Sequence, residues 1–220
     1  MVRTVKKAEV RRQEIVATAR SLFQAKEYDK TTMQDVMDQL DIAKGTIYHY
    51  FKSKEELLEA VVENIVEEDI ARKEILMKET SGNALNKIRT LISAGSMAGE
   101  HAEILEHLHH PGNLGMHIRQ LAVTLIRQAP LYGELIQQGC DEGLFQTEFP
   151  LECAEFILSA VQFLTDMGIH PWAQEDLIRR AIAFPHMIEA LLKAPQGSFQ
   201  FMLEQLQAPQ EPDGQAVVNQ

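Results

Sequence analysis

The segment Lys44–Leu58, KGTIYHYFKSKEELL, gathers side chains that suit contact with a nucleic acid. Its lysines can approach phosphate oxygens, and a tyrosine combines a hydroxyl for phosphates with a ring that packs on sugar or on a thymine methyl. Thr46 and His49 add hydrogen-bonding groups that could read a base edge. A structural alternative stays open, in which Tyr48 and Tyr50 anchor a small helical core.

A second segment, HAEILEHLHHPGNLGMH, carries the side-chain types that bind metal ions. Glu103, His107 and His110 fall at i, i+4 and i+7 on one helical face, and His117 follows from the next element. Zinc and nickel take neutral imidazole and carboxylate ligands. Three interpretations remain open: a metal-sensing site, the polar lining of a pocket for an organic ligand, and ordinary i,i+4 pairs on a solvated helix.

Catalytic signatures are missing from the sequence. It contains no H-E-x-x-H, G-x-S-x-G, P-loop or dinucleotide-binding fingerprint, and His107 and His110 have no companion nucleophile. Cys140 and Cys153 are too few for a disulfide framework or a zinc site, so we expect reduced thiols. The sequence predicts a protein that is not an enzyme and has no cofactor. A helical metalloenzyme and an adaptor for an acidic protein partner remain as alternatives.

Charge is unevenly distributed along the 220 residues, whose net charge is -11. Residues 1–54 hold 11 Lys and Arg against 7 Asp and Glu, whereas residues 55–220 hold 10 against 25. A basic end on an acidic body indicates a nucleic-acid-binding arm, with a solvated basic surface as the alternative. The chain start has no apolar run like that of a signal peptide, and no later segment is apolar enough to span a membrane. We therefore expect a cytoplasmic protein without a membrane partner.

Apolar residues recur at helical spacing and nowhere alternate convincingly as in strands, which predicts an all-α fold. The first helix should run over about 8–25. Thr32, with Asp35 three residues later, indicates the N-cap of a helix about two turns long. Ser53 and Glu56 indicate a capping box at the start of a long amphipathic helix.

A short third helix should begin near Lys44. Ile47 and Phe51 lie four residues apart and should turn toward the first two helices. Three helices in about 50 residues, the second and third joined by a tight turn, form a helix-turn-helix unit whose third helix enters the major groove of DNA. The residues left to face outward are Lys44, Thr46, Tyr48 and His49.

The run Ile15–Leu58, with TTMQDVMDQLDIAKGTIYHYFKSKEELL at its centre, resembles the amino-terminal DNA-binding domain of the TetR/AcrR family of bacterial transcriptional regulators. The pattern K-G-T-[IL]-Y-x-[YH]-F-x-[SN]-K-[ED]-x-L fixes a recognition helix, its turn and the start of the next helix. Three positions depart from the family. Asp41 stands where many members have a turn glycine, Ala43 where many have serine or threonine, and Met37 where a small residue is common.

The resemblance implies the residues that contact an operator. Lys54 would hold the DNA backbone where the chain leads into the fourth helix, and Thr46 and His49 would read bases. The full implied set is Thr32, Gln34, Lys44, Gly45, Thr46, Tyr48, His49 and Lys54.

The remaining chain should form a helical bundle, with helices from Asn83, over about 100–109, over 114–138 with a bend point at Pro130, and over about 151–167 and 175–192. The last two are apolar on more than one side, which suggests burial against a second subunit. The resemblance implies a homodimer on a palindromic operator, with recognition helices about 34 to 36 Å apart. The predicted domains are residues 1–54 for DNA binding, 55–207 for ligand binding and dimerisation, and 208–220 as a disordered tail.

The resemblance also implies an effector pocket inside the bundle and a ligand-responsive regulator, most commonly a repressor. A small apolar effector would favour a dimer that no longer matches successive major grooves. Each candidate lining residue has a place in plain core as its alternative. The candidates are Met97, His107, Leu108, Met116, His117, Leu121, Phe163, Met167 and Trp172.

Overall fold

The computed structural model describes residues 8–94, 104, 107–109 and 113–203, and its elements within these ranges are all helical, which confirms the all-α prediction. None of the described helices combines the length and the apolar content needed to cross a membrane. The elements are α1 (Ala8–Lys26), α2 (Met33–Leu40), α3 (Lys44–Tyr50), α4 (Lys54–Glu79), α5 (Ala84–Ser93), η2 (His107–His109), α7 (Leu114–Asp141), α8 (Pro150–Thr165) and α9 (Gln174–Leu192).

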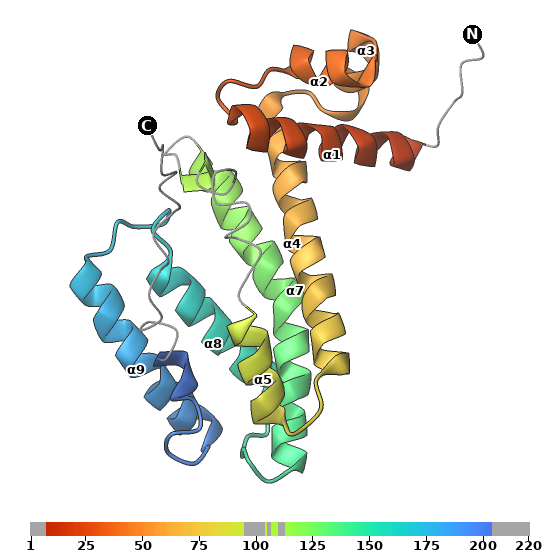
Figure 1. Ribbon diagram of the computed structural model, residues 1–220. Coiled ribbons are helices and arrows are strands. Elements are labelled where there is room, and N and C mark those ends of the chain that lie inside the picture. The colour runs from red at the N-terminus through yellow and green to blue at the C-terminus, as the bar shows by residue number, and fades with distance from the viewer. Residues whose placement is uncertain (1–7, 95–103, 105–106, 110–112, 204–220) are drawn as a thin grey trace, which may run out of the picture.

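Helices α1 to α3 sit together at one end of the long helix α4 (Figure 1). Ile47 and Phe51 are 0% and 1% exposed, as their spacing predicts, and they share a core with Ile15, Phe23 and Leu58. Burying an apolar side chain of this size stabilises the fold by about 1.5–3 kcal/mol. This core fixes α3 from behind.

The turn between α2 and α3 depends on backbone conformation. Asp41 adopts a left-handed conformation with φ 50° and ψ 51°, and its N–H donates to the carbonyls of Asp38 and Met37 at the end of α2. An aspartate tolerates this region better than most residues, so it can replace the glycine of related turns. Ala43 precedes α3 and supplies no side-chain cap, as expected from the missing hydroxyl.

Helix α4 begins with part of the predicted capping box. The Ser53 side chain accepts a hydrogen bond from the Glu56 N–H at 3.2 Å. The Glu56 carboxylate accepts from the N–H of Lys52, one residue before the cap, so the reciprocal bond differs from the prediction. Two backbone donors are still satisfied at this helix start.

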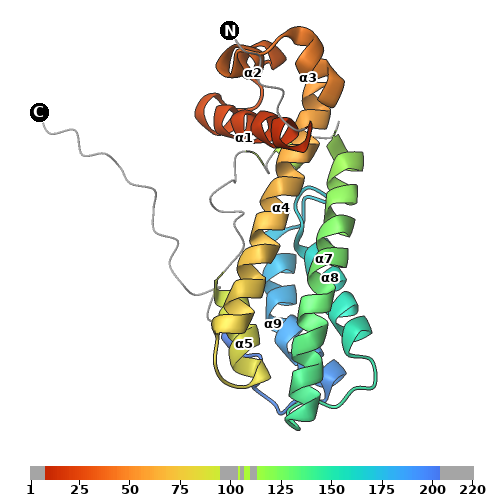
Figure 2. The same ribbon diagram turned by 90° about the vertical axis from the view of Figure 1, so that its right-hand side faces the viewer.

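Helix α4 belongs to two hydrophobic cores. Its first turns, with Leu58 and Ile65, pack with α1 to α3, beyond the domain boundary predicted at residue 54. Leu76 and Met77, near its other end, pack against the core of the bundle. Figure 2 shows α4 and α7 running side by side from one core to the other. A rigid helix therefore connects the two halves of the chain.

The bundle is centred on the packing of α7 against α8. Helix α7 runs through Pro130 without interruption, and α9 likewise contains Pro185. Gly133 lies where a β-carbon would come within 3.2 Å of the Leu151 backbone, so glycine allows the two helices to approach. Of the helix predicted over about 100–109, the described residues are Ile104, which is helical and buried, and η2, a 3-10 turn; the remainder lies outside the described residues.

Candidate nucleic-acid interface

Helix α3 presents one face to solvent. Lys44, Gly45 and His49 are exposed, and Tyr48 is half-buried against the N-terminal core. The Lys44 ammonium lies 5.6 Å from the centre of the Tyr48 ring, a cation–π contact that aligns the two side chains. A β-carbon at Gly45 would meet nothing within 4 Å, so this part of the helix surface is open to an approaching molecule.

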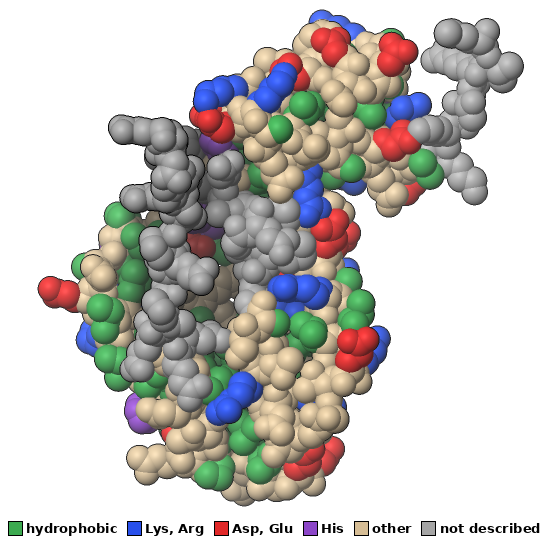
Figure 3. All heavy atoms as spheres, in the orientation of Figure 1, with side chains coloured by type: hydrophobic (Ala, Val, Ile, Leu, Met, Phe, Trp, Pro, Cys, Tyr) green, Lys and Arg blue, Asp and Glu red, His purple; other side chains and the backbone are tan. Residues whose placement is uncertain are grey.

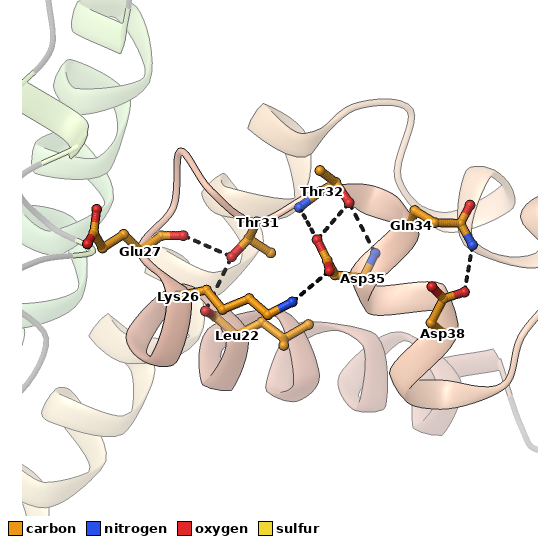
Figure 4. Close-up of polar contacts among 8 residues, drawn as sticks. All are labelled: Leu22, Lys26, Glu27, Thr31, Thr32, Gln34, Asp35 and Asp38. Atoms are coloured by element: carbon orange, nitrogen blue, oxygen red, sulfur yellow. Dashed lines mark hydrogen bonds and ion pairs between the residues drawn. The ribbon is translucent and has the colours of Figure 1, made fainter.

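The start of α2 is held by a capping box at the predicted N-cap, Thr32, drawn in Figure 4. The Thr32 hydroxyl accepts from the Asp35 N–H at 3.2 Å, and the Asp35 carboxylate accepts from the Thr32 N–H at 2.8 Å. Lys26 reaches the same carboxylate at 2.7 Å. Hydrogen bonds from Lys26 and Thr32 hold the pKa of Asp35 well below its usual range. This geometry fixes the N-terminus of α2, whose dipole favours a phosphate.

Gln34, the second predicted contact of α2, is exposed and donates to the Asp38 carboxylate at 2.6 Å (Figure 4). Behind it, the Thr31 hydroxyl is buried within hydrogen-bond distance of the Glu27 carbonyl at 2.8 Å and of the Leu22 carbonyl at 3.3 Å. Thr31 thereby fixes the chain between α1 and α2, and with it the position from which Gln34 extends.

Five of the predicted contact residues border one open surface cavity of about 440 Å³. It collects side chains from the end of the α1–α2 loop, from α2, from α3 and from the first residue of α4. Gly45, Thr46 and His49 lie on α3 outside this lining. The predicted residues that border it are Thr32, Gln34, Lys44, Tyr48 and Lys54.

Tyr28 is a residue of this region that the sequence analysis missed. Lys54 donates to the Tyr28 carbonyl at 3.1 Å and lies 4.1 Å above its ring, so its ammonium is already held by protein groups. Burial, together with the negative charges of Glu55 and Asp29, raises the pKa of Tyr28 to about 12. The position in a turn gave no periodic signal, because Tyr28 is fixed by contacts from distant segments.

A separate cavity of about 230 Å³ lies inside the bundle. Its described lining is aliphatic and aromatic, and Tyr132 contributes the one hydroxyl among these side chains. Burial, with a smaller effect of Asp69, raises the pKa of Tyr132 to about 12, so the phenol remains a neutral hydrogen-bonding group. The lining is Ile88, Ile92, Tyr132, Ile136, Ala154, Ile157, Leu158, Val161, Ile188, Leu192, Phe199 and Met202.

Among the described residues, none of the predicted ligand contacts borders this cavity. Met97 and the side chain of Leu108 lie outside the description. Met116 packs instead in the N-terminal core, and Phe163 and Met167 are 53% and 47% exposed. The sequence showed their apolar character but not the direction in which each helix turns it.

The other predicted ligand contacts are distributed over the bundle. The Leu121 carbonyl accepts from Gln162, and the ring of Trp172 lies 3.8 Å below the guanidinium of Arg180. His117 is buried beside Asp166.

The predicted metal-ligand face is described only in part. Glu103 and His110 lie outside the described residues. His107 contacts the N-terminal half of the chain, with its ring centre 4.9 Å from that of Tyr28.

The outer faces of α8 and α9 carry exposed apolar side chains. Phe156 and Met187 are 62% and 59% exposed, and both border a groove of about 350 Å³ between the two helices. Figure 3 shows hydrophobic side chains (green) along the left-hand edge of the molecule, over α9. Other members of the surface are Phe163, Ile178, Ile182 and Leu191.

Two family models match the chain. "Bacterial regulatory proteins, tetR family" matches residues 15–61, and "Tetracyclin repressor-like, C-terminal domain" matches residues 97–187. The HTH-type transcriptional repressor KstR2 of Mycolicibacterium smegmatis is 26% identical over 147 residues, which cover 64% of this chain and 71% of the relative. The uncharacterized HTH-type transcriptional regulator YfiR of Bacillus subtilis is 24% identical, covering 68% and 75%.

Solved structures share the fold. A transcriptional regulator from Cytophaga hutchinsonii superposes with a TM-score of 0.62 at 18% identity, covering 90% of this chain and 98% of that one. RolR in complex with resorcinol superposes with a TM-score of 0.60 at 17% identity, covering 89% and 94%. The helix-turn-helix geometry, the helical bundle and the matches to both family models agree: the chain belongs to the tetR family of bacterial regulatory proteins, which are DNA-binding transcription regulators and not enzymes.

Proposed function

We propose that this regulator is a homodimeric repressor that binds a palindromic operator and leaves it when a small apolar molecule occupies the bundle. The observation that carries the DNA-binding part is the support of α3. Ile47 and Phe51 are buried behind it, while Lys44 and His49 remain exposed on its other side. A helix held in this way can enter a major groove without reorganising its own core.

Within this proposal the contacts divide by role. Lys44, Tyr48 and the N-terminus of α2 at Thr32 hold phosphates, and Thr46 and His49 read base edges. Lys54 is engaged by Tyr28, so its contribution is to fix the start of α4 and to add positive potential near the DNA backbone.

Repression is supported by the relatives, several of which are named as transcriptional repressors. A repressor needs no surface for recruiting polymerase, because occupation of a promoter is sufficient.

An apolar effector is supported by the chemistry of the bundle cavity. Apart from Tyr132, the described lining side chains contain no group that donates a strong hydrogen bond. A structural neighbour, RolR, binds resorcinol, a small aromatic diol. We therefore propose a compact hydrophobic effector with one polar group directed at Tyr132. A charged effector would lose its hydration without gaining a partner.

Release from DNA is supported by the position of α8 between the bundle cavity and the outer groove. Ile157 and Val161 of α8 and Ile188 of α9 border both the bundle cavity and the outer groove. A ligand that moves these side chains would shift the outer face, and with it the partner subunit and the distance between the two recognition helices.

The decisive experiment is to sequence the fragments of genomic DNA that the purified protein retains, and to measure affinity for the recovered site over a range of salt concentrations. We expect a site with two-fold symmetry and an affinity that falls steeply with salt as counterions are released. Retention of DNA without any common sequence, or an affinity independent of salt, would exclude the proposal.

A further inference from the structure

We infer that His109, His117 and Asp166 form a binding site for a first-row divalent cation of the zinc class. These residues come from η2, from α7 and from the segment directly after α8. One ligand atom from each residue lies within 4.8 Å of the others. Ligands of a tetrahedral zinc ion are separated by roughly 3.3 Å, given zinc–nitrogen distances of about 2.0–2.1 Å. A small movement of one side chain closes the site.

The first support for the site is a buried imidazole that lies directly against a carboxylate. His117 is 4% exposed, and its Nε2 lies 2.9 Å from Asp166 Oδ1. Its Nδ1 is buried and has no hydrogen-bond partner within the described residues. The ion would bind Nε2 and the Asp166 carboxylate, whose atoms are already close enough to share one cation, and Nδ1 would then carry the proton of the neutral imidazole.

The carboxylate is already oriented as a metal ligand would be. Asp166 Oδ1 accepts hydrogen bonds from the backbone N–H groups of Gly168 at 2.8 Å and Ile169 at 3.0 Å. Its side chain is 13% exposed. Such outer contacts fix a ligating group before the ion arrives and reduce the cost of ordering it.

The third ligand, His109, is exposed, but its ring packs against neighbouring residues. The ring of His109 lies 5.0 Å from that of His117, nearly perpendicular to it. It also lies directly against Gly168, where a β-carbon would overlap with the ring. Two imidazoles and one carboxylate leave a fourth position for water, a ligand set that suits zinc, cobalt or nickel better than magnesium or calcium.

This set differs from the face that the sequence suggested. His117 is common to both, but His109 and Asp166 replace Glu103, His107 and His110. The His107 ring, two residues from His109, contacts Tyr28 of the N-terminal core. An ion at the site would fasten η2 to α7 and to the end of α8, and so would also stabilise the contact between the bundle and the DNA-binding half.

The test uses full-length protein without a histidine tag, stripped of metal with a chelator and titrated with Co²⁺ or Zn²⁺. Calorimetry gives the stoichiometry and affinity, and the visible absorption of Co²⁺ reports a site with nitrogen and oxygen ligands. We expect one ion per chain and a higher Tm with the ion. His109→Ala and Asp166→Asn should each weaken binding at least about 10-fold.

His186→Ala is the matched control, because this imidazole is 54% exposed on α9 and outside the cluster. It should leave affinity, stoichiometry and the Co²⁺ spectrum unchanged. His109 is exposed, so its replacement tests the site without creating a cavity in the core. Failure of the wild-type protein to bind one ion per chain overturns the inference, as does equal binding by wild type and His109→Ala. Neither outcome touches the proposed operator binding, which is measured separately.

Discussion

At the scale of single residues, a variant of Lys44 tests whether this side chain contacts DNA directly or only adds to the positive charge of the surface. Its ammonium is exposed beside Tyr48 at the edge of the cavity between α2 and α3. If it neutralises one phosphate per subunit, Lys44→Ala should lower operator affinity and reduce the slope of log affinity against log salt by about 1 per half-site. Fluorescence anisotropy with labelled operator over a salt series measures both quantities.

Lys30 provides the comparison for Lys44. It lies in the same half of the chain and is paired with Glu27 on the surface, outside the lining of that cavity. Lys30→Ala should leave the salt slope of the wild type intact. Equal slopes for all three proteins would mean that Lys44 does not contact the DNA.

Asp35 links pH to the stability of the α2 N-terminus. The pKa of its carboxyl is lowered by hydrogen bonds from Lys26 and Thr32, so folding favours the ionised form. This contribution is complete above the unfolded pKa of about 3.9 and is lost as pH falls through that value toward the folded pKa. Asp35→Asn should therefore destabilise the protein near neutral pH.

The difference between wild type and Asp35→Asn should shrink below about pH 4. Urea unfolding midpoints of both proteins at several pH values measure the difference, and added salt should reduce it because Asp35 lies near the surface. A constant difference at every pH would show that the amide disturbs the cap by shape instead of by charge.

At the scale of elements, local signals in the sequence were sufficient for α2 and α3. Thr32 is the predicted N-cap and forms a capping box with Asp35, and Ile47 and Phe51 are buried as their spacing predicts. These features depend on residues three or four positions apart, so the sequence contains them directly.

The lining of the bundle cavity could not be predicted from such local patterns. Tyr132, Phe199 and Met202 border it, although they are distant in sequence and Phe199 and Met202 follow the last predicted helix. The family resemblance suggested Phe163 and Met167 as lining, with plain core as the alternative, and both are half exposed. Which side of α8 faces inward is decided by packing against α7, and that information is spread over the whole bundle.

Helix α4 contains a buried ion pair between Ile65, which belongs to the first core, and Leu76, which packs against the second. Lys73 and Asp69, 7% and 8% exposed, are 2.8 Å apart, and Arg72 also pairs with Asp69. Removing one partner of a buried pair typically costs about 3–5 kcal/mol, and Arg72 should keep the loss from Lys73→Met near the lower figure. Replacing both residues by apolar ones should restore much of the stability.

Chemical unfolding of Lys73→Met and of Asp69→Leu/Lys73→Met measures this coupling. Lys30→Met is the control, because Lys30 and Glu27 form an ion pair on the surface of the chain. It should leave the unfolding midpoint nearly unchanged, since exposed pairs contribute little. A double variant less stable than Lys73→Met would show that the charges themselves hold α4 in place.

At the scale of the whole molecule, the DNA-binding end and the helical bundle differ in net charge and in exposed apolar surface. Residues 1–54 are basic overall and residues 55–220 are acidic, so the bundle should be repelled by the duplex that the other end binds. Two chains can then share one operator only if they meet away from the DNA. The exposed apolar side chains of α8 and α9 provide such a surface.

Met187 tests whether this surface joins two chains. It is 59% exposed and borders the groove between α8 and α9, so Met187→Glu would place an unpaired carboxylate within the proposed interface. Because burial of an unpaired charge costs several kcal/mol, the dimer dissociation constant should rise at least about 100-fold.

Ile75→Glu, at a site 54% exposed on α4, is the control and should leave the dimer dissociation constant unchanged. Sedimentation equilibrium measures both proteins, and operator affinity should fall with Met187→Glu alone, because a monomer contacts one half-site. Dissociation caused equally by Ile75→Glu would move the interface to another face.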